Sequence, residues 1–79
     1  MELTRRDTSF IKSILNLFAF EVNNDETHSL IQSMINAFMF HRNYENFDID
    51  VFGFENTLTV DIKMNDRVYT FELGDMEFY

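Results

Sequence analysis

The stretch TLTVDIKMNDRVYTFEL, residues 57–73, decides the fold of this chain of 79 residues. Apolar and polar side chains alternate on both sides of Asn65-Asp66, a pair typical of a two-residue hairpin loop. With this loop, the strongly apolar side chains of the two strands face one another. The opposing pairs are Leu58 with Leu73, Val60 with Phe71, and Ile62 with Tyr69. Because a slip of one residue would turn a strand inside out, the pattern predicts strands at 57–64 and 67–73 in this register.

A third strand is predicted just before this hairpin, at residues 46–54. Glu55-Asn56 forms a second two-residue loop, which places the apolar residues of the two strands opposite one another. The pairs are Phe47 with Met64, Ile49 with Ile62, and Val51 with Val60. Gly53 then falls opposite Leu58, where a missing side chain leaves room. Since both loops give the same apolar face, the sequence predicts one antiparallel β-meander.

Two helices are predicted before the sheet, at residues 5–22 and 25–42. Thr4 and Asp7 fit a capping box at the first helix, and residues 23–26 supply turn and N-cap residues between the two. Apolar residues recur at the i, i+3, i+4 spacing of an amphipathic helix. They are Phe10, Ile11, Ile14, Leu15, Phe18 and Val22 in the first helix, and Leu30, Ile31, Met34, Ile35 and Phe38 in the second. A short link favours an antiparallel pair. We therefore expect a single α+β domain over residues 1–79, with a two-helix antiparallel hairpin packed on one face of a three-stranded antiparallel β-meander (ααβββ).

The helices also share a repeated pattern, SFIKSILNLFAF at residues 9–20 and SLIQSMINAFMF at 29–40, with six identities in twelve positions. Two of the shared positions, Ile11/Ile31 and Phe18/Phe38, belong to the apolar stripe. The other four lie almost opposite it: Ser9/Ser29, Ser13/Ser33, Asn16/Asn36 and Phe20/Phe40. Convergence of two amphipathic helices, an ancestral duplication and selection for a contact face all fit this pattern. The candidate residues for self-association as a homodimer are Ser13, Asn16, Phe20, Ser33, Asn36 and Phe40.

The formal net charge of -8 belongs almost entirely to the second half of the chain. Residues 1–42 hold five acids and four bases, whereas residues 43–79 hold nine acids and two bases. Nucleic acid is therefore a poor direct partner, because phosphate binding needs Lys and Arg. A basic protein is the expected partner instead.

The predicted register places acidic and aromatic side chains on the sheet face that the helices leave uncovered. Asp50 lies directly opposite Asp61, an arrangement that stability alone does not favour, because like charges repel across a strand pair. An aromatic patch beside charge is typical of a contact site. The candidate partner-binding residues are Asp48, Asp50, Phe52, Phe54, Asp61 and Glu72, with Asp75 and Glu77 in the tail.

Three interpretations of this face compete. It can be a solvated surface, kept acidic for solubility and against edge-to-edge pairing of sheets. It can be a docking surface for a basic partner, whose carboxylates stand where phosphates would stand. It can also hold Mg²⁺ or Ca²⁺ at Asp48, Asp50 and Asp61. Because no EF-hand spacing is present and the sheet spreads these carboxylates, no metal site is expected.

Signals of catalysis are missing from the sequence. The two histidines, His28 and His41, stand alone at predicted helix ends, and the chain has no Cys. With only Gly53 and Gly74, it has no glycine-rich phosphate loop or nucleotide fingerprint. We expect a protein that is not an enzyme and needs no cofactor. No secretion signal or membrane span is recognisable, which predicts a cytoplasmic protein.

These observations favour a non-catalytic inhibitor whose acidic surface occupies a basic, nucleic-acid-binding site on a partner protein. In size and charge the chain is similar to DNA-mimic inhibitors of phage origin, including anti-CRISPR and anti-restriction proteins; the similarity covers no specific motif. It implies action in the host cytoplasm. The alternatives are an oligomeric structural or accessory subunit, and an immunity or antitoxin protein against a basic nuclease.

Overall fold

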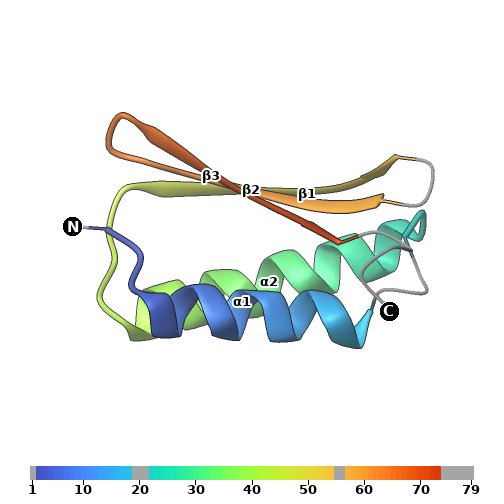
Figure 1. The fold of residues 1–79 in the computed structure, drawn as a ribbon, viewed down its shortest axis with the longest axis horizontal. Coiled ribbons are helices and arrows are strands. Elements are labelled where there is room, and N and C mark those ends of the chain that lie inside the picture. The colour runs from blue at the N-terminus through green and yellow to red at the C-terminus, as the bar shows by residue number, and fades with distance from the viewer. Residues whose placement is uncertain (1, 19–21, 55–56, 74–79) are drawn as a thin grey trace.

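The computed structural model describes residues 2–18, 22–54 and 57–73. The elements are α1 (Arg5–Leu17), α2 (Asp25–His41), β1 (Phe47–Phe54), β2 (Thr57–Met64) and β3 (Arg67–Leu73). Figure 1 shows them as two layers, with the helix pair on one side and the sheet on the other. The predicted ααβββ architecture is confirmed. In the described ranges, neither helix is long and apolar enough to cross a membrane.

The sheet is an antiparallel meander in the order β1-β2-β3, and its register is the predicted one. Ile62 of the central strand lies between Ile49 and Tyr69, and Gly53 lies opposite Leu58. Asn65 opens the turn between β2 and β3 with a left-handed φ of 57°, which Asn tolerates better than most residues. The alternation of apolar and polar residues therefore determines the register, and with it the two faces of the sheet.

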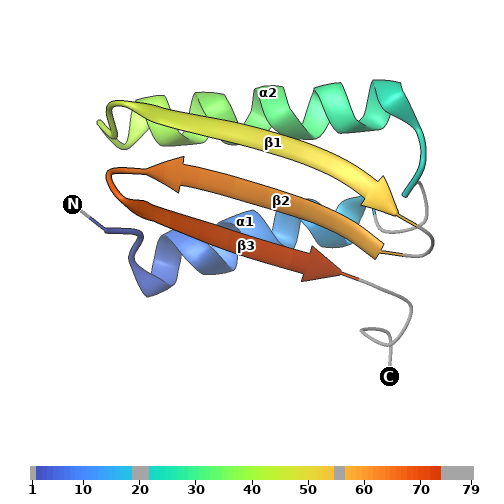
Figure 2. The same ribbon diagram turned by 90° about the horizontal axis from the view of Figure 1, so that it is seen from above.

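The core lies between the helix pair and one face of the sheet. Figure 2 shows β1 running along α2, with α1 beneath the other two strands. The helices contribute Ile11, Ile14, Leu15, Ile31, Ile35 and Met39, and the sheet contributes Ile49, Leu58, Val60, Ile62, Met64 and Phe71. Tyr44, in the connection between α2 and β1, is buried with them. Since the core uses one sheet face only, the other face is left for solvent or for a partner.

Two details of the predicted helices are wrong. The first helix was expected to reach Val22 but ends at Leu17, and Val22 lies in a turn. The Val22 carbonyl instead accepts a hydrogen bond from Nε2 of His28, 2.5 Å away. Phe10 and Leu30 were assigned to the apolar stripe but are exposed, because they lie at the outer edge of the helix pair; Met39 is buried in addition to the expected residues.

Helix α2 ends in a Schellman motif, which turns the chain towards the sheet. Asn43 has a left-handed φ of 67°. Its N–H donates to the Phe40 carbonyl, and the N–H of Tyr44 donates to the Met39 carbonyl, each at 3.0 Å. The buried side chains of Met39 and Tyr44 add the apolar pair that often accompanies this motif. The motif thereby places Tyr44 in the core and Arg42 beside the start of α1.

Asn43→Gly is expected to stabilise the protein by about 0.5–1 kcal/mol, because glycine adopts the left-handed region without the steric cost of a Cβ. Unfolding in urea, followed by circular dichroism, measures the change. Asn36→Gly is the matched control: in the exposed middle of α2 it should cost about 1 kcal/mol. Loss of stability in both variants would contradict the assigned motif.

Candidate functional site

The uncovered face of the sheet carries the acidic residues expected from the sequence. Asp48 and Asp50 come from β1, Asp61 from β2 and Glu72 from β3. Asp50 and Asp61 are register partners, as predicted. The helices cover only the opposite face of the sheet (Figure 1). The fold thus gathers the carboxylates of three strands on one side of the molecule.

Polar neighbours hold two of these carboxylates without removing them from solvent. The Thr70 hydroxyl donates to Oδ1 of Asp61 at 2.8 Å. Nζ of Lys63 lies 3.8 Å from Oδ2 of Asp50, and both side chains are more than half exposed. Because an exposed ion pair contributes about 0–1 kcal/mol, a basic group of a partner can compete with Lys63 for Asp50.

An aromatic residue lies among these acids. The Phe52 side chain is 44% exposed, and its register partner Thr59 is buried. The structure therefore brings together five predicted residues: Asp48, Asp50, Phe52, Asp61 and Glu72. Three others fall outside what is described. These are the Phe54 side chain and the whole of Asp75 and Glu77.

The described residues give no support to a metal site at Asp48, Asp50 and Asp61. No group of three or more His, Cys, Asp or Glu residues in residues 2–18, 22–54 and 57–73 is arranged to hold a metal ion. Two interactions help to explain this result: Asp50 lies beside Lys63, and Asp61 accepts a hydrogen bond from Thr70.

The residues predicted for self-association are exposed where the structure describes them. Ser13, Asn16, Ser33 and Asn36 lie on the outer side of their helices, and Phe40 is 79% exposed. The Ser13 hydroxyl donates to the Ser9 carbonyl of its own helix at 2.9 Å. Phe20 lies outside the described residues.

A groove runs between these helices, beside the predicted residues rather than through them. It is open to solvent and has a volume of about 470 Å³. Its lining is Phe10, Ile14, Met34, Ala37, Phe38 and His41. The rings of Phe10 and Phe38 stack across it, with centroids 4.3 Å apart. The sequence analysis missed this groove because it placed Phe10, Met34 and Phe38 in the core; Ile14, which also lines the groove, is buried in the core as expected.

A second, smaller hollow of about 200 Å³ lies at the end of the sheet near the β2–β3 turn. Asn43, Asn46 and Asn65 line it, and all three have a positive φ. Asn43 and Asn46 lie in the connection between α2 and β1, and Asn65 lies in the β2–β3 turn, positions at which Asn commonly adopts a positive φ. The hollow is thus a consequence of two connections that meet at one end of the sheet.

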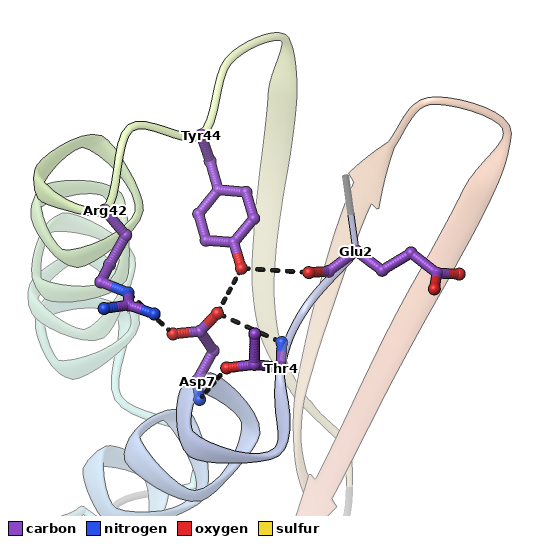
Figure 3. A network of polar contacts seen from close by, with 5 residues as sticks. All are labelled: Glu2, Thr4, Asp7, Arg42 and Tyr44. Carbon is purple, nitrogen blue, oxygen red and sulfur yellow. Dashed lines mark hydrogen bonds and ion pairs between the residues drawn. The ribbon is translucent and has the colours of Figure 1, made fainter.

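Asp7 lies at the centre of a buried network of hydrogen bonds, of which the sequence predicted only the capping box. Figure 3 shows its carboxylate, which is 0% exposed, between α1, the end of α2 and the N-terminal segment. The predicted capping box with Thr4 is present: the Thr4 N–H donates to Oδ2 of Asp7 at 3.2 Å, and the Asp7 N–H donates to Oγ1 of Thr4 at 3.1 Å. Nε of Arg42 lies 3.0 Å from Oδ1 of Asp7, and the Tyr44 hydroxyl donates to Oδ2. The same hydroxyl lies 3.2 Å from the carbonyl oxygen of Glu2.

This network changes the acidity of both buried groups. Burial acts to raise the pKa of Asp7, but the hydrogen bonds from Tyr44 and Thr4 and the charge of Arg42 outweigh it, and the pKa of Asp7 lies below its usual range. Burial, together with the hydrogen bond to Asp7, raises the pKa of Tyr44 to about 12. At neutral pH Asp7 is therefore charged and Tyr44 is a proton donor. Every oxygen of this carboxylate is engaged within the protein, so the network holds the fold together rather than offering a ligand site.

Comparisons of the chain with protein-family models, with curated proteins and with solved structures find no match. What the protein does must therefore be inferred from its own residues.

Proposed function

We propose that this protein is a non-catalytic inhibitor, which binds a basic, nucleic-acid-binding protein through the acidic outer face of its sheet. In this role it is a DNA mimic. Its carboxylates take the positions in which the partner's Lys and Arg side chains would hold phosphates. The corresponding biological role is that of a phage anti-defence protein, such as an anti-CRISPR protein, in the cytoplasm of the host.

The observation that carries the proposal is the opposition of Asp50 and Asp61 on an exposed face. Directly opposed like charges destabilise a strand pair, and a neutral residue at either position would remove that cost. Phe52, exposed beside them, adds an apolar surface that a binding site can use and a purely solvated face does not need.

Charge and apolar surface would act at different stages of binding. The acidic half of the chain, with nine acids against two bases, attracts a basic groove over a distance set by the ionic strength. Once the proteins touch, burial of Phe52 would contribute binding energy that does not depend on salt. An interface of this kind associates quickly and loses affinity as salt is added.

The triple variant Asp48→Asn, Asp50→Asn, Asp61→Asn tests the proposal. It removes three charges while leaving side chains of the same size, and an asparagine in place of Asp61 keeps an oxygen for the Thr70 hydroxyl. Immobilised wild-type and variant proteins are used to capture proteins from a bacterial lysate at low and moderate salt, and the eluted proteins are identified by mass spectrometry. The wild type should retain a Lys/Arg-rich protein that the triple variant loses.

The matched control removes three exposed acids elsewhere: Glu26→Gln, Glu45→Gln and Asp66→Asn. Its net charge equals that of the triple variant, so it should still capture the partner if the sheet face is the binding surface. Equal capture by all three proteins, or equal loss in both variants, would count against a site on this face. A captured nuclease that is inactivated by the complex would favour the immunity or antitoxin role, which uses the same surface and the same physics.

A further inference from the structure

The groove between the helices lies at one end of the hairpin, where α1 begins and α2 ends. Phe10 and Ile14 form its wall on α1, and Met34, Phe38 and His41 are among its residues on α2. Its floor is apolar, and Phe10 remains 44% exposed even with its ring stacked on Phe38. An open apolar groove of this kind is typical of a surface that another helix pair covers.

The other end of the same hairpin carries protruding apolar side chains. Leu17 is 64% exposed, and Leu30 is 48% exposed. Leu17 follows Phe10 by seven residues, and Leu30 precedes Met34 by four. Because residues at these spacings share one face of a helix, each leucine lies on the same face of its helix as the groove residues. One face of the hairpin thus has a hollow at one end and two projections at the other.

Opposite charges lie at the two ends of this face. Arg6 lies in the first turn of α1, at the groove end. Glu26 lies in the first turn of α2, at the end that carries the leucines. Both residues are exposed. The groove end therefore carries a basic residue and the leucine end an acidic one.

We propose that this face binds a second copy of the chain, related to the first by a two-fold axis that lies in the interface and crosses the helices. This rotation places the leucines of each copy over the groove of the other, and the acidic end of each over the basic end of the other. A two-fold contact forms every such pair twice, as a self-complementary surface requires. Any other partner would have to present the same hollow, projections and charges in the same order.

The size of the face agrees with this assignment. The molecule measures 31 × 25 × 21 Å, and the helix layer extends along its longest and shortest dimensions (Figure 2). The outline of this side of the molecule is therefore roughly 650 Å², close to the lower limit of about 600 Å² per partner for specific protein–protein interfaces. The dimer would have four helices in its middle and an acidic sheet face on each outer side. The acidic sheet faces of both copies would therefore remain accessible to the partner of the proposed inhibitor.

Sedimentation equilibrium from about 1 to 100 µM, the range that reports a micromolar dissociation constant, tests the dimer. The wild type should approach twice the mass of the chain. Leu17→Lys should raise the dissociation constant roughly a hundredfold, because each dimer loses two buried leucines and gains two cations facing a basic surface. Lysine suits the C-terminal end of α1, so the monomer should keep its melting temperature.

Val68→Lys is the matched control, since it makes the same kind of change at an exposed aliphatic residue of the sheet. It should leave the dissociation constant within about twofold, because the sheet face lies outside this interface. A wild type that stays monomeric throughout the concentration range, or equal weakening by Leu17→Lys and Val68→Lys, would overturn the proposal.

Exchange of charges tests the orientation. Arg6→Glu leaves an acidic residue at both ends of the face, and Glu26→Lys leaves a basic residue at both ends. Each variant alone should dimerise about threefold to tenfold more weakly than the wild type. An equimolar mixture of the two should recover the wild-type affinity, because the mixed dimer again opposes unlike charges. A mixture as weak as the separate variants would contradict the two-fold arrangement.

Discussion

Asp7→Ala is expected to lower the free energy of unfolding by about 3 kcal/mol, because it removes buried hydrogen bonds to a charged group, each worth about 1.5–3 kcal/mol. The substitution removes the acceptor for the Thr4 N–H and the Tyr44 hydroxyl, and it takes away the partner of Arg42. A domain of 79 residues has only about 4–12 kcal/mol of stability in total, so the variant should be close to unfolding at 37 °C. Unfolding in urea at 15 °C and at 25 °C measures the loss.

Asp7→Asn separates the charge of this residue from its shape. Because the pKa of Asp7 in the folded protein lies below its usual range, the carboxylate contributes stability above about pH 4 that is lost as the pH falls through the folded-state pKa. The stability difference between the wild type and Asp7→Asn should therefore be largest near pH 7 and shrink below about pH 4.

Asp48→Asn is the control for this pH series, since Asp48 is exposed on the sheet. Its difference from the wild type should stay within about 0.5 kcal/mol at every pH. A difference between the wild type and Asp7→Asn that does not change with pH would show that the network does not depend on an ionised Asp7.

Gly53→Ala is expected to cost about 3 kcal/mol, at the upper end of the range for overpacking a well-filled site. A Cβ at this position would lie 1.9 Å from the carbonyl oxygen of Val22 and 2.8 Å from its carbonyl carbon. Since His28 holds the same carbonyl by a hydrogen bond, the turn cannot move away without losing that contact. Thermal and urea unfolding both report the loss.

Val22→Ala serves as the control for Gly53→Ala. It removes the Val22 side chain, which would also touch the new Cβ at 2.9 Å, but it leaves the backbone in place. The double variant Gly53→Ala, Val22→Ala should therefore be no more stable than Gly53→Ala alone. Recovery of stability in the double variant would mean that the conflict involves the side chain and not the turn itself.

The sheet could be predicted residue by residue, whereas the packing around Gly53 could not. Alternation of apolar residues around Asn65-Asp66 has only one register that keeps a single apolar face, and the structure has that register. Gly53 was correctly placed opposite Leu58, but the space that it leaves is used by the backbone of Val22. A contact between a turn and a strand distant in sequence leaves no periodic signal.

The acidic face could be predicted because it follows directly from the register, but the helical groove required the structure. The 3.6-residue period places Phe10 and Leu30 near the apolar side of their helices, and it does not say where the neighbouring helix ends and solvent begins. In the same way, the capping box identified Thr4 and Asp7, while Arg42 and Tyr44 reach Asp7 from more than thirty residues away. A residue pattern within one segment cannot predict contacts between residues so far apart in the sequence.

The affinity for the captured partner, measured at several salt concentrations, tests most directly whether the acidic sheet face is the binding surface. For the wild type, the dissociation constant should rise at least about tenfold between 50 and 300 mM salt. At 50 mM salt it should also rise at least about tenfold for Asp48→Asn, Asp50→Asn, Asp61→Asn, and less than about threefold for Glu26→Gln, Glu45→Gln, Asp66→Asn. A dissociation constant that does not change with salt, or that is the same for both triple variants, would contradict the proposed function.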